Sequence, residues 1–297
     1  MKRVLIFGGD GILGSHLFLG LREHHVVGIT LHAAAKAFPP GLFAGAEVFD
    51  RIDAADAPAI RDVVERFRPD WILNAVGLVK RPLAQDPVAS LLANTVFPHR
   101  LAQVCAAHDA RLLHFSTDCV FSGTQGGYRE SDRPDNDDWH GRCKALGEPA
   151  GDHVLVLRTS FIGLELGCKK SLLEWFLAQH GRVPGYVNAI WSGLTAIELA
   201  RLTASLMADR APLHGVWHVA SPALSKFELL TRINARLGNR GVEVFPDEHF
   251  VCNRSLDGSA FAARTGYAPP SWDEMLDELV ADIGRRWKVG QPSFWPS

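Results

Sequence analysis

The chain has 297 residues, enough for one large α/β domain with a smaller lobe and a core that needs no metal or disulfide. Its 31 basic and 33 acidic residues give a net charge of −2, which excludes a global basic field for nucleic acid or an anionic membrane. Five scattered cysteines without a Cys-x-x-Cys pair, and no apolar run near the ~18 to 20 residues of a membrane span, predict a soluble cytoplasmic protein. We expect no metal site, no nucleic-acid partner and no membrane partner.

The first residues predict a strand, a glycine turn and a helix. An apolar run at 4–7 ends at three glycines spaced three apart, and an amphipathic helix is expected at 12–22. Glycines at this spacing let the backbone turn sharply and approach a ligand, and the helix then points its free amides at a pyrophosphate. A glycine turn without a ligand is the alternative. The expected cofactor contacts are Gly8, Gly11, Ile12, Leu13 and Gly14.

The second expected strand, at 26–30, ends where the adenosine ribose should lie. An acidic residue there would bind the 2′-hydroxyl of NAD, but the chain has Thr30, Leu31 and His32 instead, with Lys36 soon after. A missing carboxylate and a nearby cation favour NADP, with NAD as the alternative. His32 and Lys36 could equally belong to a solvated loop.

Strands and helices continue to alternate, which predicts a parallel, doubly wound sheet of the Rossmann type with its site at the carboxyl ends of the strands. Further strands are expected at 47–49, 71–74 and 112–115, and helices at 57–67 and 87–108. Residues at or after strand ends are therefore also expected near the cofactor: Asp53, Asn74, Val76 and Gly77.

Several motifs follow one another in the first 160 residues. They are Asn74-Ala75, Ser116-Thr117-Asp118 with Val120-Phe121, Tyr128-x-Glu130-x-Asp132-x-Pro134, Gly141-x-x-Lys144 with Gly147-Glu148, and Leu157-Arg158-Thr159-Ser160. Together with the Gly-x-x-Gly-x-x-Gly turn, they resemble the extended short-chain dehydrogenase/reductases, and most specifically the dTDP-4-dehydrorhamnose reductase family. The resemblance implies a reduced nicotinamide dinucleotide, a 4-keto nucleotide sugar and a role in carbohydrate biosynthesis. It assigns Thr117 to the carbonyl and Lys144 to the carbonyl and the nicotinamide ribose.

One residue departs from that family. Its Tyr-x-x-x-Lys reads His140-Gly141-Arg142-Cys143-Lys144 here, and none of the three tyrosines lies four residues before the lysine. His140 can be a substitute acid/base, which we favour because Thr117 and Lys144 remain. It can instead be a relic in a binding protein, or Tyr128 or Tyr186 can reach the site from a loop. An imidazole with an ordinary pKa of about 6.5 beside a lysine would tend to be neutral, so a bound water could relay the proton.

The second half should form most of a substrate-binding lobe. We expect residues 1–160 to bind the dinucleotide and residues 161–297 to form mainly the lobe, with segments near 187–220 and 242–253 returning to the first domain. The expected elements are strands at 154–158 and 215–219 and helices at 170–179, 195–209, 226–237 and 272–287. In the loop 185–193, Tyr186 and Trp191 could hold a base or a sugar, although Trp191 could equally be core. Arg254 could bind the substrate diphosphate or make a surface salt bridge.

These observations favour an NADP(H)-dependent oxidoreductase acting on a nucleotide-linked sugar, with reduction of a 4-keto group as the leading reaction and Thr117, His140 and Lys144 at the carbonyl. A homodimer is an open expectation. The alternatives are a catalytically silent NADP-binding regulatory subunit, as the regulatory subunit of methionine adenosyltransferase resembles this family, and a nucleotide-sugar epimerase or dehydratase.

Overall fold

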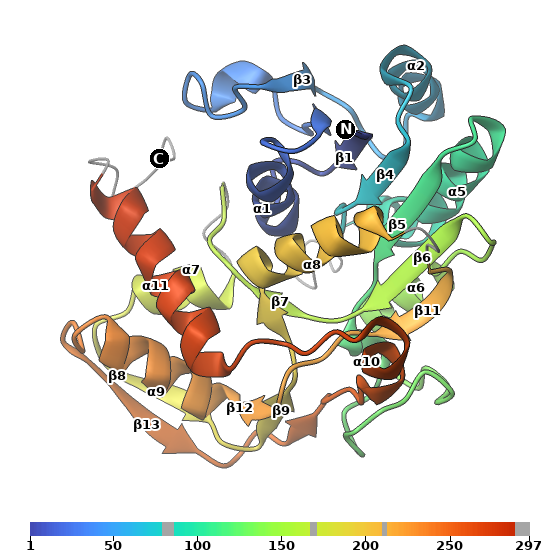
Figure 1. Ribbon diagram of the computed structural model, residues 1–297. Coiled ribbons are helices and arrows are strands. Elements are labelled where there is room, and N and C mark those ends of the chain that lie inside the picture. The colour runs from blue at the N-terminus through green and yellow to red at the C-terminus, as the bar shows by residue number, and fades with distance from the viewer. Residues whose placement is uncertain (79–85, 167–170, 210–212, 289–297) are drawn as a thin grey trace.

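The computed structural model describes residues 1–78, 86–166, 171–209 and 213–288. Its centre is a seven-stranded sheet in which every pair of neighbours is parallel. The strands are β1 (Arg3–Phe7), β2 (Val26–Thr30), β3 (Ala46–Phe49), β4 (Trp71–Asn74), β5 (Arg111–Phe115), β6 (Val154–Arg158) and β11 (Gly215–His218). Their order is β11-β6-β5-β4-β1-β2-β3, so the chain winds outwards twice from β1 (Figure 1). The predicted doubly wound parallel sheet is confirmed.

Helices cover both faces of this sheet because its strands are apolar on both sides. In β1, Val4 and Ile6 belong to one core cluster, whereas Leu5 and Phe7 belong to another. The first cluster lies under α1 (Ile12–Leu21), α8 (Ala196–Ala208) and α11 (Trp272–Lys288), and the second under α2 (Ala57–Phe67) and α5 (Phe97–Ala107) (Figure 1). No helix in the described ranges is both long and apolar enough to cross a membrane.

The helix expected at 87–108 contains a π-helical turn. It consists of α4 (Pro87–Leu91), the π segment η2 (Leu92–Val96) and α5, and the amide of Phe97 donates to the carbonyl of Leu92, five residues earlier. Pro98 has no N–H, so it cannot bond the carbonyl of Asn94 and the regular ladder is interrupted here. The expected single helix is thus corrected to two α-helices joined by a wider turn.

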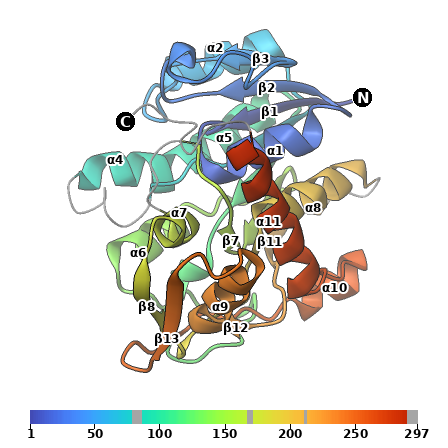
Figure 2. The same cartoon turned by 90° about the vertical axis from the view of Figure 1, so that its left-hand side faces the viewer.

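The second half adds three small sheets beside the main one, as Figure 2 shows below β1 and β2. They pair β7 (Phe161–Ile162) with β10 (Leu194–Thr195), β12 (Leu224–Ser225) and β14 (Cys252–Asn253) with β9 (Ala189–Trp191), and β13 (Val242–Asp247) with β8 (Gly181–Tyr186). Of the segments expected to return to the main domain, β11 joins the main sheet, while β13 and β14 pair within the small sheets.

The remaining helices connect these strands. They are η1 (Ala35–Ala37), η3 (Asp118–Val120), α6 (Trp139–Leu146), α7 (Leu172–Leu177), α9 (Lys226–Arg236) and α10 (Ser259–Thr265). The helix expected at 170–179 is therefore shorter at both ends, and its first residue, Lys170, lies outside the described residues, as does Cys168.

Candidate active site

The glycine turn between β1 and α1 is closed by backbone hydrogen bonds. The amide of Gly9 donates to the carbonyl of Thr30 at 2.8 Å, and the amide of Gly11 donates to the carbonyl of Gly8 at 3.0 Å. A Cβ at Gly14 would lie 2.1 Å from the oxygen of Gly8, so only glycine lets the helix pack this close to the turn. Because α1 has no side-chain cap and no acidic residue in its first turn, its first amides are left for an anion.

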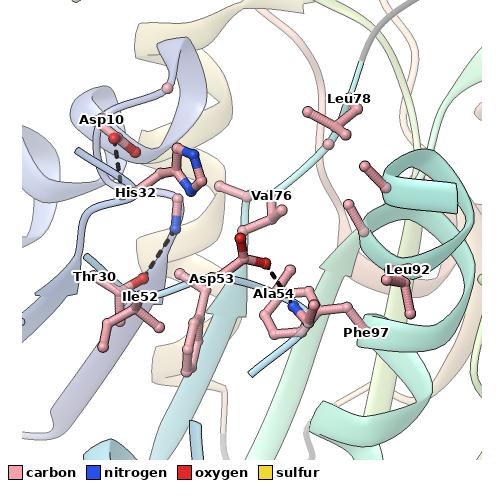
Figure 3. Close-up of a pocket in the computed structure, with 18 of the residues that line it drawn as sticks. Asp10, Thr30, His32, Ile52, Asp53, Ala54, Val76, Leu78, Leu92 and Phe97 are labelled. Atoms are coloured by element: carbon pink, nitrogen blue, oxygen red, sulfur yellow. Dashed lines mark hydrogen bonds between the residues drawn. The ribbon is translucent and has the colours of Figure 1, made fainter. Parts of the chain in front are cut away.

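A cavity of about 520 Å³ opens beside this turn (Figure 3). It is lined by seven residues expected at the cofactor, namely Gly8, Gly11, Thr30, His32, Asp53, Val76 and Gly77. It is also lined by residues that were not among the expected cofactor contacts, including Asp10, Ile52, Leu78, Leu92 and Phe97. The cavity thus joins the ends of β1, β2 and β4 to the helical segment that follows β4.

The edge of this cavity at the end of β2 contains a carboxylate that was not expected. Asp10 accepts hydrogen bonds from the amides of His32 at 2.9 Å and Ala33 at 3.2 Å, as Figure 3 shows for His32. The side chains of His32 and Lys36 are both exposed, and Lys36 lies in η1, away from the cavity lining. The preference for NADP over NAD stays a prediction.

Two asparagines hold the segment after β4. The side-chain oxygen of Asn74 accepts from the amide of Val76 at 3.1 Å, and its nitrogen lies 3.0 Å from Nδ1 of His114 on β5. Asn94, in the π turn, accepts from the amide of Leu78 at 3.0 Å and donates to the carbonyl of the same residue at 2.9 Å. These bonds fix the floor of the cavity.

Lys144 is attached to the strand that ends at Thr117. Its ammonium donates to the carbonyl of Phe115, the last residue of β5, at 2.8 Å. Burial lowers the pKa of Lys144 to about 8, and the nearby carboxylate of Glu148 opposes this shift. Thr117, two residues beyond Phe115, is partly exposed, accepts from the amide of Cys119 at 3.1 Å and donates to Asp118 at 3.2 Å.

His140 and Lys144 lie one turn apart on α6, and His140 is buried. The helix begins at Trp139 and is capped by Asp138, whose side chain accepts from the amide of Gly141 at 2.7 Å. A Cβ at Gly141 would lie 2.4 Å from the carbonyl oxygen of Cys119, so this glycine allows α6 to approach η3 closely. The structure therefore brings α6 against the segment that carries Thr117.

A buried ionic network lies behind these residues. The carboxylate of Glu148 accepts from Ser116 at 2.6 Å and from Nε and Nη2 of Arg158 at 2.9 and 2.8 Å. Both charged side chains are almost completely buried, with 7% and 6% exposure. Arg158 also lies 3.3 Å from Nε2 of His218 on β11. The network therefore connects β5, β6, β11 and the end of α6.

The three tyrosines of the chain differ in their contacts and exposure. The hydroxyl of Tyr128 accepts from the amides of Gly123 at 3.1 Å and Gln125 at 3.2 Å. The hydroxyl of Tyr267 donates to Glu198 at 3.0 Å, and burial raises the pKa of Tyr267. Tyr186 is 39% exposed. The hydroxyl groups of Tyr128 and Tyr267 thus both make hydrogen bonds within the protein.

The substrate residues expected from the second half lie in different settings. Tyr186 contacts Phe250, with ring centroids 5.1 Å apart. Trp191 is buried and packs 5.5 Å from Trp272. Arg254 donates from Nε to the carbonyl of Phe121 at 2.9 Å and contacts the sulfur of Cys119 at 3.4 Å. The guanidinium thus lies against the loop that follows Thr117.

A family model described as the RmlD substrate binding domain matches residues 1–284. The chain is 30% identical over 230 residues to a probable low-salt glycan biosynthesis reductase of Haloferax volcanii, covering 73% of each chain. It is 30% identical over 245 residues to dTDP-4-keto-6-deoxy-D-glucose reductase of Streptomyces niveus, covering 79% of this chain and 78% of that one. It is also 30% identical over 156 residues to methionine adenosyltransferase 2 subunit beta of Xenopus tropicalis, covering 51% of this chain and 43% of that protein.

Solved structures show the same fold. A dTDP-4-dehydrorhamnose reductase from Bacillus anthracis in complex with NADP superposes with a TM-score of 0.76 at 21% identity, covering 95% of this chain and 99% of that one. A hypothetical dTDP-4-dehydrorhamnose reductase from Sulfolobus tokodaii superposes with a TM-score of 0.75 at 26% identity, covering 90% and 95%.

Proposed function

The chain belongs to the RmlD substrate binding domain family, and we propose that it is an NADP(H)-dependent reductase of the 4-keto group of a nucleotide-linked sugar. The observation that carries this proposal is the hydrogen bond from Lys144 to the carbonyl of Phe115, which anchors the lysine to the strand that ends at Thr117. The reductases among the relatives support the reaction class. We place the activity in the cytoplasm and expect a homodimer.

The cofactor site fits a dinucleotide. The first turn of α1 offers uncapped amides, at Ile12 and Leu13, to a pyrophosphate, and the cavity beside Gly8 has room for the adenosine part. A reduced nicotinamide ring, when bound, supplies the hydride. NADP is the proposed form and NAD the alternative, in line with the NADP complex of the Bacillus anthracis structure.

Three residues at the carbonyl would then stabilise the alkoxide, hold the cofactor and supply the proton. The hydroxyl of Thr117 would donate to the carbonyl oxygen and stabilise the alkoxide that forms. The ammonium of Lys144 would hold the cofactor ribose and add positive charge beside the reacting oxygen. His140 would deliver the proton, directly or through a water, because its imidazole is shorter than the tyrosine side chain found at this position in the family.

The small sheets would form the substrate lobe. We propose that residues 1–160 bind the cofactor and that most of 161–297 binds the sugar nucleotide, with Tyr186, Trp191 and Arg254 on the substrate side. The position of Arg254 against the loop after Thr117 supports this division.

NADPH oxidation with a panel of 4-keto nucleotide sugars tests the proposal. We expect turnover by the wild type and a loss in kcat of roughly 100-fold for Thr117→Val, since one hydrogen-bond donor to a developing oxyanion is worth about this much. Thr231→Val is the matched control, because Thr231 lies on an exposed position of α9. The proposal is wrong if no sugar oxidises the cofactor, or if Thr117→Val turns over like the control.

A second candidate is a catalytically silent NADP-binding regulatory subunit. Two observations favour it: His140 replaces the tyrosine of the family motif, and half of the chain resembles methionine adenosyltransferase 2 subunit beta. Under this proposal the wild type would turn over no sugar and would co-purify with an enzyme partner in stoichiometric amount. His140→Ala would then bind NADP with unchanged affinity in a calorimetric titration.

A further inference from the structure

Lys226, the first residue of α9, lies on the face of Trp191. Its ammonium is 3.5 Å from the centroid of the indole ring, a distance typical of a strong cation–π contact. Burial lowers the pKa of Lys226 to about 8, and the charge of Asp118 opposes this shift. Within the described ranges, this ammonium makes no hydrogen bond and no ion pair with the protein. Its three donor protons therefore lack protein acceptors, and the partly exposed side chain leaves them open to a ligand.

The same pair contains a second unsatisfied donor. Trp191 is only 4% exposed, and its indole N–H has no hydrogen-bond partner among the described residues. A buried donor without an acceptor costs free energy, and native proteins rarely leave one unless a water or a ligand fills the place. This N–H is closed to solvent, so the ammonium of Lys226 is the donor of the pair that a ligand with acceptor oxygens can reach.

The Lys226–Trp191 pair lies where the small sheets meet the end of β5. The carboxylate of Asp118, next to Thr117, acts on the ammonium, and the thiols of Cys119 and of Cys252 on β14 lie near it. A ligand group bound here would therefore sit next to the place proposed for the reacting carbonyl.

Arg254 is the other cation in this region, but its donors are already used. Its Nε donates to the carbonyl of Phe121 at 2.9 Å, its Nη1 contacts Cys119, and its Nη2 lies 3.5 Å from the carbonyl of Ser122. The fork of Arg254 thus holds the loop after Thr117. Of the two cations, only Lys226 keeps all of its donors for a ligand.

We propose that Lys226, seated on Trp191, is the cation that binds the diphosphate of the nucleotide sugar, whereas Arg254 positions the loop after Thr117. This proposal rests on the proposed function and names one residue of its substrate site. A diphosphate offers several charged acceptor oxygens, so it would satisfy the ammonium by charge-assisted bonds. The carboxylate of an acidic sugar could accept hydrogen bonds from the same ammonium, and the test below separates a diphosphate from a carboxylate.

Calorimetric titration of dTDP, UDP, thymidine and uridine, with NADP present, tests this assignment. We expect Lys226→Met to weaken the binding of both diphosphates about 10- to 100-fold, as for the loss of a charge-assisted bond, and to leave both nucleosides unchanged. Lys226→Arg should keep most of the affinity. Lys2→Met is the matched control, because Lys2 also lies over a tryptophan, 5.6 Å from the ring centroid of Trp71, and should bind all four compounds like the wild type.

The assignment would be overturned by equal diphosphate affinity in Lys226→Met and the wild type, or by an equal loss for diphosphates and nucleosides. It would also be overturned if Lys226→Met only raised KM for sugars that carry a carboxylate. The melting temperature and NADP affinity of each variant show that it is folded. Failure of the proposed function is seen separately, because binding of nucleoside diphosphates is measured without turnover.

Discussion

Replacement of Glu148 by glutamine tests how the carboxyl ends of β5 and β6 are held. The Glu148 carboxylate accepts three hydrogen bonds, from Ser116 at 2.6 Å and from Arg158 at 2.9 and 2.8 Å. Glutamine keeps the shape and one oxygen, but it removes the charge and turns an amide donor towards the guanidinium. Because Arg158 is only 6% exposed, its charge would stay buried without compensation.

The expected loss in the free energy of unfolding is about 3 kcal/mol, the lower end of the range for a broken buried ion pair, because glutamine keeps one acceptor. For a chain of this size, that corresponds to a fall of roughly 6 to 12 °C in melting temperature. Thermal and urea unfolding, followed by circular dichroism, measure both quantities. Glu148→Leu combined with Arg158→Met should be closer to the wild type than Glu148→Gln, because apolar side chains of similar size need no counter-charge.

The matched control is Glu243→Gln, which breaks an ion pair of another kind. Glu243 lies 3.3 Å from Arg182, and both side chains are 66% exposed, so water screens the pair. The expected loss there is about 0 to 1 kcal/mol. If Glu148→Gln lost no more stability than Glu243→Gln, the buried network would not hold β5, β6 and α6 together as argued.

Two further predictions concern proton transfer and cofactor binding. Because burial lowers the pKa of Lys144 to about 8, its ammonium is lost as the pH rises through that value, and kcat/KM should fall there. Glu148→Gln should move this fall to lower pH, since the carboxylate raises the pKa of Lys144, whereas Glu243→Gln should leave it in place. An unmoved profile in Glu148→Gln would exclude Lys144 as the group. Gly14→Ala should weaken NADP binding by at least about tenfold, because the added Cβ would lie 2.1 Å from a backbone oxygen of the turn. Gly284→Ala, with nothing within 4 Å of its added Cβ, should bind NADP like the wild type, and equal affinity in both variants would contradict the role of the turn.

The sequence predicted the parts of the fold that depend on local patterns. The strand, glycine turn and helix at the start of the chain follow from neighbouring residues, and the alternation of strands and helices was enough to predict the parallel sheet. The partners of β13 were not predictable in this way. The apolar residues of Val242–Asp247 indicate a strand, but its pairing with β8 joins residues about sixty positions apart. The π turn before Pro98 was missed because the apolar pattern hardly changes across it.

For the candidate site too, local motifs could be recognised in the sequence, but contacts between distant residues could not. Only the family resemblance assigned Thr117 and Lys144 together to the carbonyl, and no pattern in the sequence predicted the contacts of Arg254. A guanidinium suits carbonyl oxygens as well as phosphates, and its carbonyl partners lie more than 130 residues earlier in the chain. Asp10 was overlooked for a related reason. Its carboxylate lies in the glycine turn, and its partners, the amides of His32 and Ala33, come next to it only when the chain has folded.

Reduction of a carbonyl needs a proton donor, and in this chain His140 stands where the family has its tyrosine. Tyr267 donates its hydroxyl proton to Glu198, so this proton is not free to serve a carbonyl, whereas the hydroxyl of Tyr128 accepts from two backbone amides. Lys144 donates one of its three protons to the carbonyl of Phe115. His140 lies one turn before it on the same helix, where the family has its phenol. A side chain shorter than tyrosine leaves room for a water, and an imidazole can take up and return the proton of such a water. If the chain is a reductase, we therefore expect the proton to come from the pair of His140 and a bound water.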